Sequence, residues 1–81
     1  MDVVVHFYSY FKELTGCTQT VETMPPDSTI GDLLKRLYNR YPKLTAMSNS
    51  TLIAVGVEYQ GRSYTLKEHE EVSLFPPVQG G

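Results

Sequence analysis

The last residues of the sequence are the ones best suited to chemistry. Gly80 and Gly81 have no Cβ, so the backbone that leads to the α-carboxylate of Gly81 can enter a narrow slot. Pro76-Pro77 favours an extended polyproline conformation of about 3.1 Å per residue, and Val78-Gln79 completes a thin arm. We interpret residues 76–81 as a tail that offers its carboxylate to another protein's active site. A frayed terminus without function is the alternative.

Other side chains that could do chemistry are scattered. Cys17 is the only cysteine, so it has no disulfide partner in the chain, and His6 and His69 lie far from it in sequence. A Cys–His nucleophile pair stays open but is not favoured, and we interpret His6 as an exposed strand residue. No set of residues has the spacing of metal ligands, so we predict no metal and no cofactor bound by this chain.

Three glutamates near the C-terminus resemble an acid/base or metal cluster at first sight. Glu68, Glu70 and Glu71 lack the spacing of a regular element and lie beside Lys67, so we interpret residues 67–71 as a solvated turn.

Composition limits the function classes. Eighty-one residues with 41% hydrophobic and 20% charged residues are typical of one soluble globular domain. A net charge of −2 gives no basic footprint for nucleic acid, and we place the cluster Lys35, Arg36 and Arg40 on the solvent face of a helix. The N-terminus has no basic leader, and its apolar run is far shorter than the ~20 residues of a membrane span. We therefore expect a cytoplasmic protein without membrane contact.

Two strands must position the tail. Residues 72–75 alternate with period two and end at Pro76, which has no N–H for a ladder. Residues 3–8 are rich in β-branched and aromatic residues, with Val3, Val5 and Phe7 facing the core. If these strands are neighbours, Tyr8 and Phe75 form an exposed patch beside the tail, on the side away from Val72 and Leu74. Tyr59 is a candidate extension of that patch.

The remaining elements follow from periodicity and turn residues. A helical turn at residues 9–14 should end at Gly16, and residues 18–23 read as a weaker strand with Val21 facing inward. Thr29 and Asp32 form a capping-box-like start of a helix whose apolar stripe ends before Pro42. The stripe consists of Ile30, Leu33, Leu34, Leu37, Tyr38 and Tyr41.

The second half of the chain should complete the sheet. Residues 42–50 read as a polar connection, and residues 52–57 as a strand covered on much of both faces. Gln60-Gly61 turns the chain before a short edge strand at residues 63–65. This order predicts an α+β, β-grasp (ubiquitin-like) fold at residues 1–75, a mixed sheet with one main helix on one face. Residues 76–81 then form the functional C-terminal tail.

The sequence from Val3 to Gly81 resembles the small subunit of molybdopterin synthase, the MoaD-like branch of the ubiquitin-like sulfur carriers. The specific block is residues 71–81, Glu-Val-Ser-Leu-Phe-Pro-Pro-Val-Gln-Gly-Gly. Weaker matches are residues 8–16, the helix start at residues 29–34, and Ala54-Val55-Gly56. Lys12 stands where the family usually has Arg, Gly56 replaces a common Asn, and His69 replaces a turn Gly.

The resemblance implies a sulfur shuttle that is not catalytic alone. An activating enzyme would adenylate Gly81 with ATP, sulfur would displace AMP, and the thiocarboxylate would then enter the large subunit of molybdopterin synthase. There it would build the dithiolene of molybdopterin in a hetero-oligomer of two small and two large subunits. Gly80 and Gly81 would carry the chemistry, and the residues that contact partners would be Tyr8, Lys12, Tyr59, Phe75, Pro76, Pro77, Val78 and Gln79.

Other functions stay open at this level. The thiocarboxylate could serve thiamine, cysteine or tRNA thiolation, or Gly81 could form an isopeptide bond as a protein modifier. A binding module with an inert tail is the remaining alternative. Carrier and modifier chemistry pass through the same acyl adenylate, so the sequence does not separate them.

Overall fold

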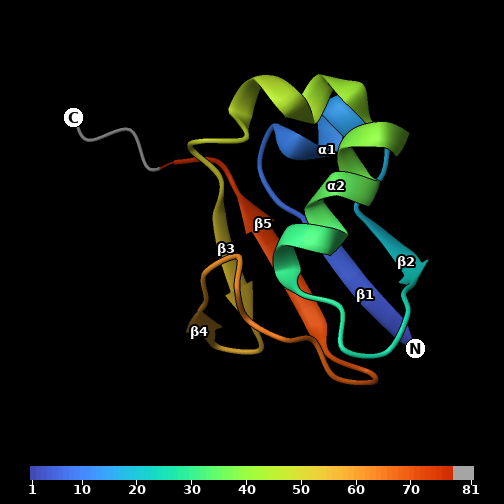
Figure 1. The fold of residues 1–81 in the computed structure, drawn as a ribbon. Coiled ribbons are helices and arrows are strands. Elements are labelled where there is room, and N and C mark those ends of the chain that lie inside the picture. Colours follow the sequence, from blue (N-terminus) through green and yellow to red (C-terminus); the bar gives the residue numbers. More distant parts are fainter. Residues whose placement is uncertain (78–81) are drawn as a thin grey trace.

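A computed structural model describes residues 1–77 as a mixed five-stranded sheet with helices on one face (Figure 1). This arrangement confirms the β-grasp prediction. The elements are β1 (Asp2–Phe7), α1 (Phe11–Thr15), β2 (Gln19–Thr23), α2 (Ile30–Arg40), the 3-10 helix η1 (Pro42–Met47), β3 (Leu52–Val55), β4 (Glu58–Tyr59) and β5 (Glu71–Phe75). Within the described residues, no helix has the length and hydrophobicity needed to cross a bilayer.

The first and last strands lie side by side at the centre of the sheet. The strand order is β2-β1-β5-β3-β4, which Figure 1 shows from right to left. β1 and β5 run parallel, with Val5 opposite Val72 and Phe7 opposite Leu74, and the other pairs are antiparallel. A parallel neighbour requires a long crossover, and α2 lies within that crossover.

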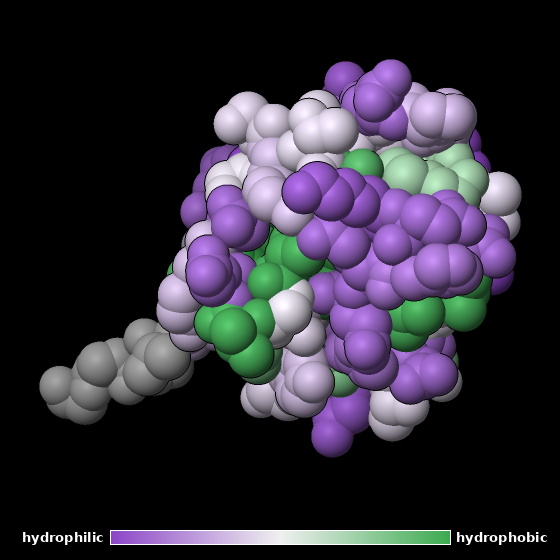
Figure 2. All heavy atoms as spheres, turned by 90° about the horizontal axis from the view of Figure 1, so that it is seen from below, coloured by the Kyte–Doolittle hydropathy of each residue, from purple (hydrophilic) through white to green (hydrophobic). Residues whose placement is uncertain are grey.

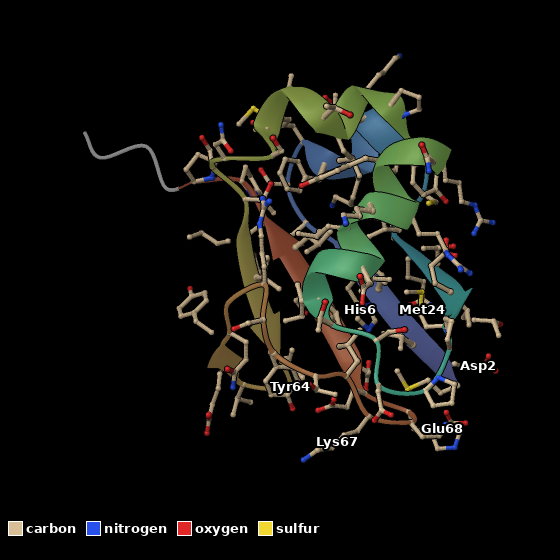
Figure 3. The ribbon with its side chains drawn as sticks, in the orientation of Figure 1. Asp2, His6, Met24, Tyr64, Lys67 and Glu68 are labelled. Atoms are coloured by element: carbon tan, nitrogen blue, oxygen red, sulfur yellow. The ribbon has the colours of Figure 1, made fainter. Side chains whose placement is uncertain are left out.

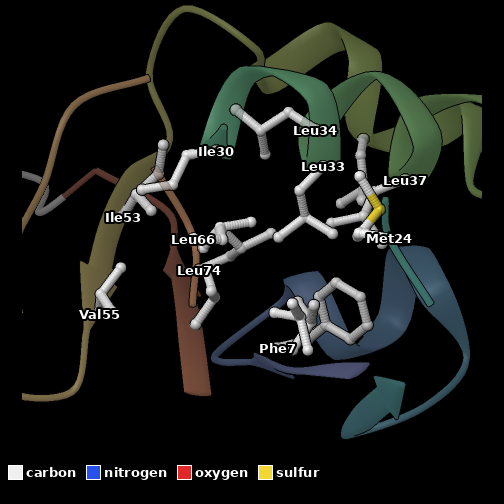
Figure 4. Packing of buried hydrophobic residues seen from close by; sticks show 14 of the residues in the cluster. Phe7, Met24, Ile30, Leu33, Leu34, Leu37, Ile53, Val55, Leu66 and Leu74 are labelled. Atoms are coloured by element: carbon white, nitrogen blue, oxygen red, sulfur yellow. The ribbon is translucent and has the colours of Figure 1, made fainter. Parts of the chain in front are cut away.

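The core occupies one side of this sheet. Alternate residues of β1 and β5 are buried against the apolar stripe of α2, because successive strand side chains point to opposite faces. Figure 4 shows α2 side chains such as Leu33 and Leu37 directed toward Phe7 and Leu74. The buried positions include Val3, Val5, Phe7, Ile30, Leu33, Leu34, Leu37, Val72 and Leu74.

α2 begins and ends where the sequence predicts. The Asp32 N–H donates to the Thr29 hydroxyl over 3.2 Å, and the Thr29 N–H donates to the Asp32 carboxylate over 3.0 Å. The latter bond is the main reason that the pKa of Asp32 lies below its usual value. At the other end Tyr41 leaves the helical conformation before Pro42, whose ring disfavours a helical residue in front of it.

The predicted orientation of the edge strand β2 is wrong. Val21 is 51% exposed, whereas the Glu22 side chain is 6% exposed and faces the helices opposite Val3. The carboxylate of Glu22 accepts a hydrogen bond of 2.5 Å from Arg40 at the end of α2. Arg40 is therefore a partner of a buried charge and not merely a solvated residue, and this pairing is what permits an acidic residue to face inward.

The hairpin after β3 also differs from the prediction. β3 ends at Val55 because Gly56 has a φ of 61°, and Val57 is 98% exposed. The edge strand is β4, not residues 63–65, of which Thr65 forms only an isolated bridge to Thr29.

The connection after α2 is more ordered than predicted. Residues 42–50 contain η1, whose Leu44 is buried in the core. Pro42 occupies its first turn, where the missing proline N–H costs no hydrogen bond. The polar composition of residues 42–50 therefore gave no indication that Leu44 belongs to the core.

Truncation of Leu74 tests the assignment of buried and exposed faces of the sheet. Leu74→Ala should lower the free energy of unfolding by about 2–5 kcal/mol because it removes buried methyl groups and leaves a cavity. Val21→Ala, at an exposed position, should change it by less than about 0.5 kcal/mol. Chemical denaturation measures both, and equal effects would contradict the assignment.

The pair between Glu22 and Arg40 gives a second prediction. Arg40→Ala should destabilise the fold more than Lys35→Ala on the exposed side of the same helix, because only the former leaves a buried carboxylate unpaired. Adding Glu22→Leu to Arg40→Ala should recover part of the loss. Thermal unfolding of the wild type and these three variants measures this, and no recovery would show that the burial of Glu22 is not the cause.

Candidate functional site

The C-terminal arm begins at a defined point of the sheet. Phe75, the last residue of β5, lies opposite Leu52, the first residue of β3. Pro76-Pro77 follows at once and leaves the sheet there (Figure 1). Without N–H groups these prolines cannot extend the ladder, so β5 ends as predicted. The predictions for Val78, Gln79, Gly80 and Gly81 lie outside the described residues.

Two aromatic rings stack beside this point. The Tyr8 N–H donates to the Leu74 carbonyl, so the backbone continues alongside β5 past the end of β1. The rings of Tyr8 and Phe75 lie 4.7 Å apart between centroids with 14° between their planes. Tyr8 is exposed and Phe75 half-buried, on the face opposite the buried Leu74. We call Tyr8 and Phe75 the aromatic patch, and its predicted position is confirmed.

Tyr59 lies on the same face, two strands away from Phe75. It is opposite Ala54, which is opposite Ser73, and residues directly opposite each other share a face. The Tyr59 side chain is 72% exposed. Lys12 is exposed on α1, but no hydrogen bond or ring contact in the described part of the chain joins it to the aromatic patch. Their roles as partner contacts stay predictions.

Next to the patch lies a polar pair that sequence reasoning missed. His6 Nε2 and Glu71 Oε1 are 2.6 Å apart, and the carboxylate accepts the hydrogen bond. His6 is half-buried, and Glu71 belongs to β5 and not to a solvated turn. The pair could have been predicted from the alternation of side chains along two neighbouring parallel strands. This alternation places His6 and Glu71 on the same face of the sheet as Tyr8 and Phe75.

Cys17 is not paired with a histidine. Its Sγ lies 3.7 Å from the Thr15 hydroxyl and 3.8 Å from the Tyr41 hydroxyl. Neither neighbour is a base that would generate a thiolate, so the structure gives no support for a nucleophilic cysteine.

The glutamates of residues 67–71 mainly form hydrogen bonds that stabilise the loop before β5. Glu70 accepts hydrogen bonds from the Tyr64 hydroxyl at 2.8 Å and the Lys67 N–H at 2.6 Å, and the first raises the pKa of Tyr64. Glu68 accepts the Asp2 N–H at 3.2 Å, and Figure 3 shows these two residues close together. Figure 2 views this end from below and shows hydrophilic surface with hydrophobic patches on either side of it. Across residues 1–77 no group of three or more His, Cys, Asp or Glu is arranged for a metal ion.

The five-stranded sheet and the residues on its helix-free face define a ubiquitin-like β-grasp domain with an aromatic patch beside its C-terminal arm. The sequence profile of the ThiS family matches residues 5–81. The chain belongs to the ThiS family.

Curated relatives agree with this membership. The molybdopterin synthase sulfur carrier subunit of Dictyostelium discoideum is 31% identical over 77 residues, covering 91% of this chain and 90% of that one. The subunit of the same name from Arabidopsis thaliana is 27% identical and covers 100% and 84%. Small archaeal modifier protein 3 of Haloferax volcanii is 26% identical and covers 100% of both chains.

Solved structures share the fold. A putative molybdopterin converting factor subunit 1 from Pyrococcus furiosus has a TM-score of 0.88 at 24% identity, covering 96% of this chain and 99% of that one. A complex of subunits 1 and 2 of molybdopterin-converting factor from Helicobacter pylori contains a chain with a TM-score of 0.73 at 23% identity, with full coverage of both.

Proposed function

We propose that this chain is the sulfur-carrier subunit of a molybdopterin synthase. The observation that carries the proposal is the place of the aromatic patch, at the same end of β5 from which Pro76-Pro77 departs. A partner that covers the patch would lie where the arm begins. The family match through residue 81 and the names of the relatives support the same function.

The proposed chemistry takes place at the α-carboxylate of Gly81. One carboxylate oxygen attacks the α-phosphorus of ATP, which forms an acyl adenylate and releases pyrophosphate. Hydrosulfide supplied by a sulfur donor then attacks the carbonyl carbon, the bond to AMP breaks, and loss of the S–H proton leaves a thiocarboxylate. The thiocarboxylate sulfur then bonds to a pterin precursor to form a thioester, and hydrolysis of that thioester by water leaves the sulfur on the pterin for the dithiolene of molybdopterin and returns the carboxylate.

The residue types of the arm suit these steps. Side chains at Gly80 and Gly81 would crowd the adenylate or the wall of a channel, whereas glycine permits close approach of other groups. Pro76 and Pro77 restrict the arm before it binds, which lowers the ordering cost of entering a channel. The chain supplies the reacting atom, and its partners supply the catalytic groups and bind ATP.

Two partners follow from the proposal. An adenylating enzyme would activate Gly81, and a large subunit would receive the thiocarboxylate in an assembly of two small and two large subunits. The two-subunit complex from Helicobacter pylori supports the second partner by analogy. We place these steps in the cytoplasm.

A protein modifier is the second candidate function. The similarity to small archaeal modifier protein 3 favours it, because the same acyl adenylate could be passed to a lysine. A sulfur carrier for thiamine, cysteine or tRNA thiolation would share the thiocarboxylate and differ only in the acceptor.

Mass spectrometry tests the central step. Co-expression with the activating enzyme and a sulfur donor should make the intact protein heavier by the difference between one sulfur and one oxygen, and fragmentation should place the gain on Gly81. Deleting Gly81, or extending the chain beyond it, should abolish the gain without changing thermal unfolding. A gain on Cys17, or a lysine adduct through Gly81, would contradict the carrier proposal.

Substitution of Phe75 tests the docking face. Phe75→Asp should leave the domain folded, because Phe75 lies outside the core cluster, but weaken binding to both the activating enzyme and the large subunit. Asn39→Asp adds the same charge on the exposed side of α2 and is the matched control. Unchanged binding by Phe75→Asp in titration calorimetry would show that the patch is not the contact surface.

A further inference from the structure

The face of the sheet opposite the helices has an uneven charge. We call the strand positions on this side the open face, as assigned by strand parity and register. None of these positions carries lysine or arginine, whereas two carry carboxylates. The open face comprises Asp2, Val4, His6, Gln19, Val21, Thr23, Leu52, Ala54, Tyr59, Glu71, Ser73 and Phe75, with Tyr8 adjoining.

The Glu71 carboxylate is connected to the aromatic patch through the imidazole of His6. Its Oε1 is bound by His6, and the rings of His6 and Tyr8 lie 6.4 Å apart between centroids. The Glu71 side chain is 65% exposed, and within residues 1–77 its Oε2 accepts no hydrogen bond. Asp2, the other carboxylate of the face, is the first residue of β1 and lies at the opposite end of that strand from Tyr8. Glu71 is therefore the open-face carboxylate that is best placed to bind a partner at the patch.

A partner that covers the patch and extends along the sheet over His6 would also remove water from around Glu71. Removing water from a charged carboxylate is costly unless new hydrogen bonds replace those to water. A wholly apolar partner surface would pay that cost, whereas a cationic side chain opposite Oε2 would offset it and distinguish partners by charge. His6 fixes the carboxylate in advance, which reduces the ordering required on binding.

We propose that Glu71, positioned by His6, is a second anchor of the docking face, and that the large subunit meets it with an arginine or lysine beside an apolar pocket for Tyr8 and Phe75. This inference rests on the proposed function. It adds to that function a charge requirement on the partner that the aromatic patch alone does not impose.

Binding of the large subunit tests the anchor. Glu71→Gln keeps the shape of the side chain but removes its charge, so it should weaken binding about tenfold and reduce the dependence of the dissociation constant on salt. Glu58→Gln is the matched control, because Glu58 lies opposite Val55 on the other side of the sheet, and its binding should match the wild type. Equal affinity and equal salt dependence of the Glu71→Gln variant would overturn the proposal.

The role of His6 is tested by a double-mutant cycle. His6→Phe should weaken binding in the wild-type background but add little in the Glu71→Gln background, because it acts through the carboxylate. Additive losses would contradict positioning by His6. Thermal unfolding of each variant separates a binding effect from a loss of fold.

Thiocarboxylate formation, measured on the same proteins, keeps the two proposals distinguishable. A wild type that gains sulfur on Gly81, together with unchanged binding of Glu71→Gln, would refute the anchor and leave the carrier function in place. A wild type that neither gains sulfur nor binds the large subunit would refute both.

Discussion

The parallel pairing of β1 with β5 is the constraint on which the rest of the structure depends. It joins the two ends of the described chain at the centre of the sheet, so that one register fixes both faces. On the helix side it places Phe7 opposite Leu74 within the core. On the other side it brings Tyr8 onto Phe75 and His6 onto Glu71. A shift by one residue would exchange the two sets and destroy both the core and the aromatic patch.

Because the helices cover one face of the sheet, the core of this small domain lies on that face alone. α1, α2 and η1 all contribute buried residues to that core, and the opposite face keeps its side chains exposed or half-buried, except for Ala54. The aromatic patch, in which Tyr8 is exposed and Phe75 half-buried, lies beside the start of the arm, and apolar surface gathered in this way usually marks an interaction site. The two rings fit the proposed carrier function, in which docking and delivery of the reacting group would occur at the same end of the sheet.

At the edge strand β2, polar contacts connect the sheet to the helix α2. An acidic residue faces inward there, and α2 supplies the cation that pairs with it. The pair links the end of the helix to the edge of the sheet, and a second arginine, Arg36, donates to the carbonyl of Thr23. Polar contacts thus stabilise the edge of a core whose centre is entirely apolar. α2 contributes charged side chains to these contacts as well as apolar side chains to the core.

Much of this protein could be predicted from local sequence signals. The apolar stripe, the cap by Thr29 and Asp32, and Pro42 determined α2, and alternation from Val72 to Phe75 determined β5. These signals act over a few residues, through backbone sterics, helix periodicity and strand pleating, so one sequence suffices to read them. The aromatic patch followed from the same alternation once the two strands were taken as neighbours.

Only the tertiary structure decided the contacts between residues far apart in the chain. The sequence allows either Val21 or Glu22 to face the helices. Glu22 takes this position because Arg40, 18 residues away, pairs with its carboxylate. His6 and Glu71 are 65 residues apart, and their bond exists only because β1 and β5 are adjacent. Such pairs depend on register and packing across the whole domain, which no local pattern of residues contains.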